Sequence, residues 1–161
     1  MASAHGTLPL RALTAKRSET LSSYEQIDLT LSLDNADLSL LPVFSNHVEW
    51  AMGPTEGTLK LHGTLAAPRL DGTVRVTGGA LKVKYLENPV TDMELRIDAL
   101  GDRVVVRSCT GHMGAGGYMM TGHMDLSGME LTEYDFTLVM NELAIKTSFF
   151  DGPLSGSLHL T

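Results

Sequence analysis

Apolar and polar residues alternate along most of the chain, which is the pattern of β-strands with one buried face. The first clear example covers residues 24–33, where Ile27, Leu29, Leu31 and Leu33 alternate with polar residues. From residue 57 onward the period of two returns in almost every segment. Turn signals such as Gly78-Gly79, Asn88-Pro89 and Ser127-Gly128 separate these segments at spacings of roughly 8–12 residues, as in sheets of short antiparallel strands. The pattern predicts nine or ten strands.

One set of alternating positions is apolar in strand after strand, and we predict that these side chains share one continuous face. A face of this kind either packs against a second layer, as in a closed sandwich, or curls into an open groove. The candidate groove residues are Leu59, Leu61, Leu65, Val74, Val76, Leu81, Val83, Leu95, Ile97, Val104, Val106, Met120, Met124, Phe136, Leu138 and Met140.

Residues 42–52 have a different period. Pro42 suits the first turn of a helix, and Val43, Phe44, His47, Val48 and Ala51 follow at helical spacing. Gly53-Pro54 is a typical stop signal. We therefore predict one short amphipathic α-helix near residues 42–52.

Composition places the chain among folded proteins of ordinary size. Of its 161 residues, 43% are apolar and 19% are charged, which is too apolar for a disordered chain. No apolar run reaches the length of a transmembrane helix. The net charge of -7 repels phosphate backbones and argues against nucleic-acid binding.

Candidate catalytic and metal-binding groups are few. None of the six histidines stands at a metal-binding spacing, and we place His62, His123 and His159 on the polar side of strands. The single cysteine, Cys109, has no base or orienting group indicated by spacing, so a small buried side chain is favoured over a nucleophile. We therefore expect that the protein is not an enzyme and that it binds no metal ion and no cofactor.

Two further clusters have structural explanations. The glycines within residues 111–117 are followed by an alternating segment and not by a helix, which indicates a bulged hairpin turn and not a phosphate loop. Pairs such as Asp92 with Glu94 are typical of a solvated strand face. Many of the nine methionines fall in the last third, where they either fill gaps in a core or line a surface for variable acyl chains.

The chain also contains a short internal repeat. Residues 56–63 (EGTLKLHG) are matched in type by residues 155–161 (SGSLHLT). Such a repeat is typical of arrays of sheet units that pack against their neighbours. We therefore expect a single β-rich domain over residues 24–161 that ends one strand into a next unit. We also expect residues 1–23 to be an N-terminal segment apart from this domain, derived in part from expression of the protein.

Residues 57–79 read GTLKLHGTLAAPRLDGTVRVTGG. A Gly-x-Leu-x-Leu-x-Gly-Thr-Leu strand, a Pro-x-Leu-x-Gly turn and a second strand in this order resemble the AsmA/TamB-like bacterial envelope proteins, including the TamB-type translocation and assembly module. Residues 34–41, the strands around Gly116 and Gly122, and residues 156–160 also resemble that family. The resemblance covers residues 28–161.

The resemblance implies a mainly β fold, an open curled antiparallel sheet shaped like a taco, here with one short helix. It also implies a location in the periplasm of a two-membraned bacterium, with the full-length protein anchored in the inner membrane. The expected ligands are phospholipid acyl chains, carried between the inner and outer membranes. An alternative is an interaction scaffold that assists outer-membrane protein assembly by strand pairing, with an outer-membrane barrel assembly protein as partner. A carbohydrate-binding sandwich is disfavoured, because Trp50 is the only tryptophan.

Overall fold

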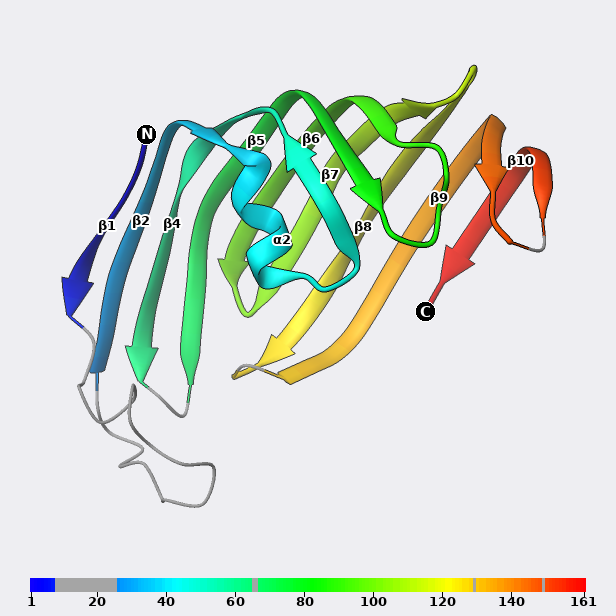
Figure 1. Cartoon of the computed structure of the whole chain (residues 1–161). Helices are drawn as coiled ribbons and strands as arrows, with labels where there is room; N and C mark the ends of the chain where they lie inside the picture. Colours follow the sequence, from blue (N-terminus) through cyan, green and yellow to red (C-terminus); the bar gives the residue numbers. More distant parts are fainter. Residues whose placement is uncertain (8–25, 65–66, 129, 149) are drawn as a thin grey trace.

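The computed structural model describes residues 1–7, 26–64, 67–128, 130–148 and 150–161. These residues form one open antiparallel sheet in the order β1-β2-β4-β5-β6-β7-β8-β9-β10, with β3 paired to β5. Figure 1 shows the strands side by side, with β1 at one edge and β10 at the other. The elements are β1 (Ala2–Thr7), β2 (Gln26–Asp37), the 3-10 helix η1 (Leu38–Leu40), α2 (Leu41–Phe44), β3 (Val48–Met52), β4 (Pro54–Thr64), β5 (Pro68–Val83), β6 (Val90–Gly101), β7 (Arg103–Met113), β8 (Gly116–Ser127), β9 (Glu130–Lys146) and β10 (Asp151–Leu160). The predicted mainly β, open and curled sheet is confirmed.

The helix predicted near residues 42–52 is largely wrong. Helical structure covers η1 and α2 only, and η1 begins where the Asp37 carboxylate accepts a 2.7 Å hydrogen bond from the Ser39 amide. The remainder of the segment is β3, whose Ala51 pairs with Leu81 of β5. Pairing with β5 provides backbone hydrogen bonds along one edge of β3, and its β-branched Val48 and aromatic Trp50 suit a strand. Tertiary pairing therefore overrides the helical spacing.

A line of bulges crosses the sheet near one end of its strands. Four residues in four different strands have left-handed backbone angles, and each lies at or beside a shift in strand register: Asn35 (φ 47°), Gly78 (φ 59°), Asp92 (φ 50°) and Glu142 (φ 50°). A bulge adds one residue and bends the strand, so apolar positions continue on the same face after a step of three residues. We call these four residues the bend line.

β5 shows the bend most clearly. Gly78-Gly79 was predicted as a turn between strands, but both glycines lie inside β5. Figure 1 shows β5 rising along the sheet, turning over at the top and descending in front of it, close to α2 and β3. A Cβ on Gly53 would lie 2.7 Å from the Gly79 Cα, so the two backbones approach too closely for any other residue at Gly53. We call α2, β3 and residues 80–89 the front layer.

The core lies between the sheet and the front layer. Its buried apolar residues are Val76, Val90, Met93, Val106, Cys109, Met113 and Leu143. Leu38 of η1 and Leu86 of the front layer pack against this cluster. The core therefore follows the bend line, where the two limbs of the bent strands face each other.

Candidate functional site

Strand register places the apolar positions on a single face, the inner face, which is the side that the front layer covers in part. Antiparallel partners share a face, so the register can be followed from strand to strand. One row crosses all nine successive strands and contains only apolar side chains and glycine: Ala2, Leu33, Gly57, Val74, Ile97, Val106, Gly122, Phe136 and Leu160. We call this set the central row. At about 4.8 Å per strand it extends roughly 38 Å across the sheet.

The candidate groove residues come together on this inner face. Val74, Ile97, Val106 and Phe136 belong to the central row, and the other described candidates lie in neighbouring rows of the same face. Leu65 lies outside the described residues. That these side chains contact lipid stays a prediction.

The inner face is closed near the bend line and more open elsewhere. Val76 is 1% exposed and Val106 is 6% exposed, so both belong to the packed core. The other described candidates, Val74 and Leu59 among them, are half-buried. Toward the edge formed by β10, Leu158 of the same face is 45% exposed. The strand alternation therefore predicts the face but not how exposed each position is.

Several inner-face residues were absent from the candidate set. Met93, Met113 and Leu143 are buried in the core on this face, beside Cys109. Met93 continues the alternation of Leu95 and Ile97, whereas Val90 and Leu143 are reached only across the left-handed residues Asp92 and Glu142, where the spacing along the strand becomes three. The only sequence signal for such a bulge is the modest tolerance of aspartate for left-handed angles, and glutamate offers none.

The opposite, outer face carries cross-strand ion pairs. Arg103 donates two hydrogen bonds to the Asp125 carboxylate, at 2.5 and 2.6 Å, and Arg107 donates one to Asp98 at 2.7 Å. The hydrogen bonds from Arg103 hold the pKa of Asp125 below its usual range. The two faces of the sheet therefore differ in chemistry, with charge outside and hydrocarbon inside.

Histidines also lie on the outer face, next to carboxylates. His62 and Asp71 are 2.5 Å apart, and this contact lowers the pKa of Asp71. His159 lies 3.7 Å from Asp135. Among the residues that the structure describes, no group of three or more histidine, cysteine, aspartate or glutamate side chains is arranged to hold a metal ion.

Cys109 is placed as a core residue. Its Sγ lies 3.8 Å from the Tyr118 Oη, and burial raises the pKa of both groups. A neutral, buried thiol is a weak nucleophile. The hairpin predicted around residues 111–117 is present, because β7 ends at Met113 and β8 begins at Gly116.

Comparisons with family models, curated proteins and solved structures find no match for this chain. Within the described ranges, no helix has the length and apolar character needed to span a membrane. The resemblance to the AsmA/TamB-like proteins therefore rests on the sequence motifs alone.

Proposed function

We propose that this chain is a segment of a periplasm-spanning envelope protein of the AsmA/TamB-like type, and that its inner face conducts phospholipid between the inner and outer membranes. The observation that carries the proposal is the central row, which is free of polar side chains from β1 to β10. Its role is to keep acyl chains out of water, and no catalytic residue takes part.

The energetics of lipid transfer call for such a surface. Each CH₂ group of an acyl chain removed from water is worth about 0.8 kcal/mol, so a lipid crossing an aqueous gap needs a continuous apolar path. The central row supplies a path across the strands, and half-buried side chains such as Val74 and Ile97 retain surface for an acyl chain to contact. The outer face, with its ion pairs, favours water.

Strand pairing with a partner is the second candidate function, and the exposed sheet edges favour it. Every residue of β1 is exposed, as are nearly all residues of β10. Edge strands with free backbone groups can accept a strand from another chain, such as an outer-membrane barrel assembly protein.

Site-specific photocrosslinking separates these functions. A photoreactive amino acid at Leu138 places the probe on the inner face, and the same probe at Val139, the next residue, places it on the outer face at an exposed apolar position. Conduction predicts phospholipid adducts at Leu138 and few at Val139 when the protein is labelled among membranes of the cell envelope.

The same comparison is repeated at Leu59 and its outer-face neighbour Lys60. Equal lipid labelling on both faces, or none on either, would contradict conduction. Protein adducts confined to probes in β1 and β10, together with no lipid adducts at Leu138 and Leu59, would favour the scaffold.

A further inference from the structure

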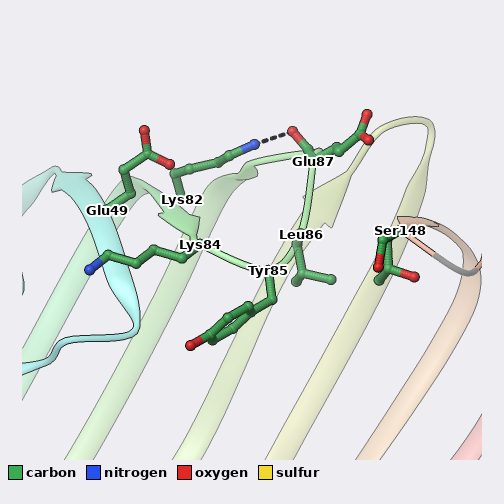
Figure 2. Close-up of a pocket in the computed structure, with 8 residues that line it drawn as sticks. Glu49, Lys82, Lys84, Tyr85, Leu86, Glu87 and Ser148 are labelled. Carbon is green, nitrogen blue, oxygen red and sulfur yellow. Dashed lines mark hydrogen bonds between the residues drawn. The ribbon is translucent and has the colours of Figure 1, made fainter.

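A hollow of about 620 Å³ lies at the end of the front layer, between β3, the β5–β6 connection and the residues after β9. Its size is within the range of small-molecule sites. Figure 2 shows the Lys82 side chain extending to Glu87, the Lys84 side chain leaving the same segment toward β3, and Ser148 on the opposite side. The residues that line this rim pocket are Glu49, Lys82, Lys84, Tyr85, Leu86, Glu87, Thr147 and Ser148.

The charges of the rim pocket are only partly matched by one another. Lys146 lies 2.8 Å from the Glu87 carboxylate, and this contact raises the pKa of Lys146. The Lys82 ammonium donates a hydrogen bond to the backbone carbonyl oxygen of Glu87. This partner is uncharged, so it does not neutralise the charge of Lys82. Within the described residues, Lys84 and Glu49 take part in no ion pair. Two ammonium groups and one carboxylate therefore remain for a ligand.

The rim pocket also connects to the apolar core. Leu86 lines the pocket and at the same time packs against the core cluster of the inner face. Tyr85 is 69% exposed, and its ring centroid lies 6.0 Å from that of His47. An exposed aromatic ring attracts an alkylammonium group through its negative face. The pocket thus combines two ammonium groups that point in different directions, one carboxylate, an exposed aromatic ring and an apolar boundary.

We propose that the rim pocket binds the zwitterionic headgroup of a lipid, a phosphate diester that carries an ammonium group, while the acyl chains lie on the inner face. This inference rests on the proposed function and assigns the headgroup class to it. Lys82 and Lys84 bind the phosphate, since each ammonium offers three donors on a flexible stem. Glu49 binds the ammonium group of the ligand.

Calorimetric titration of the whole chain with soluble probes tests the proposal. The probes are dihexanoyl phosphatidylethanolamine, dihexanoyl phosphatidylglycerol, dihexanoylglycerol and inorganic phosphate. We expect Lys84→Ala and Lys82→Ala each to weaken binding of both phospholipids roughly tenfold, as expected for loss of a charge-assisted hydrogen bond. Binding of dihexanoylglycerol, which has no headgroup charge, stays unchanged. Lys60→Ala, an outer-face lysine paired with Asp28, is the matched control and changes no affinity.

Glu49→Gln tests the zwitterion specifically. It removes the charged acceptor for the ammonium group. It therefore weakens the binding of dihexanoyl phosphatidylethanolamine and leaves the binding of dihexanoyl phosphatidylglycerol unchanged. Unchanged affinities in all three pocket variants, with dihexanoylglycerol still bound, would overturn the headgroup site and leave conduction standing. Equal lysine-dependent binding of inorganic phosphate would identify a free-anion site instead, and absence of binding by every lipid probe would count against conduction itself.

Discussion

The bend line and the part of the sheet between it and the opposite strand ends, here called the flat part, share the same strands and the same apolar face. They differ in how far that face is covered. At the bend, the front layer and the sheet enclose Val76, Met93 and Met113 at 1–4% exposure. Away from the bend, Val74 and Leu59 lie on the same face without a full covering layer. The core and the candidate lipid surface therefore differ in whether the front layer covers them, and not in the hydrophobicity of their side chains.

Val76 and Val74 give the sharpest test of that difference. The two residues lie on one strand and one face, two positions apart. We expect Val76→Asp to destabilise the protein by more than about 4 kcal/mol, because it buries a carboxylate without a partner. Val74→Asp is expected to cost only about 1–2 kcal/mol, since a half-buried carboxylate keeps contact with water.

Urea unfolding followed by circular dichroism measures both variants, with Val74→Ala and Val76→Ala as controls for lost side-chain volume. The folded Val74→Asp protein is then suited to lipid-binding assays, where it should lose binding. Equal destabilisation at the two positions would show that the flat part is as closed as the bend.

Two glycines, Gly72 in the flat part and Gly117 beside the bend line, provide the second comparison. Gly72 has φ 137°, and a Cβ there would lie 1.9 Å from the Thr58 carbonyl oxygen. Gly117, in β8, has ordinary backbone angles, and the nearest atom to a Cβ would be the Gly111 carbonyl oxygen at 3.5 Å. We expect Gly72→Ala to cost at least about 3 kcal/mol and Gly117→Ala to stay within about 0.5 kcal/mol of the wild type.

The Tm values of the two variants, measured by thermal unfolding, test whether β4 and β5 lie as close together at Gly72 as the structure shows. A Gly72→Ala protein that is as stable as Gly117→Ala would show that β4 and β5 can move apart at this point. The flat part would then be held by its ion pairs more than by backbone contact.

The sequence predicts the flat part better than the bend. Alternation with a period of two assigns Leu59, Val74 and Ile97 to one face, because a slip of one residue would move all of them to the other side. The turn at residues 114–115 is predicted for the same reason, since the alternation restarts after it. These features depend on local patterns that no distant contact modifies.

The bend depends on contacts that the sequence does not show. Asp92 and Glu142 adopt left-handed angles although neither is glycine, and Gly78-Gly79 reads as a turn between strands. Residues 48–52 have helical spacing but pair with β5. In each case the bent strands and the front layer select the backbone conformation, so the burial of Val76 and Val106 follows from tertiary closure and not from their neighbours in sequence.

The smallest expected effect concerns the end of the flat part away from the bend, where Arg103 and Asp125 join β7 to β8 on the outer face. Because the hydrogen bonds from Arg103 lower the pKa of Asp125 in the folded state, its contribution to stability is present above the unfolded value of about 4 and is lost as the pH falls through the folded value. Asp125→Asn should therefore lower Tm slightly at pH 7, and the difference from the wild type should shrink and then vanish as the pH falls below the unfolded value and through the lowered folded value.

Glu130→Gln serves as the control for net charge, because Glu130 belongs to no ion pair within the described residues. A Tm difference for Asp125→Asn that persists unchanged at low pH would mean that the carboxylate acts through its shape and not through its charge. In that case the flat part would be held together at this end by packing, as the bend is, and the contrast between the two regions would be confined to their exposure to water.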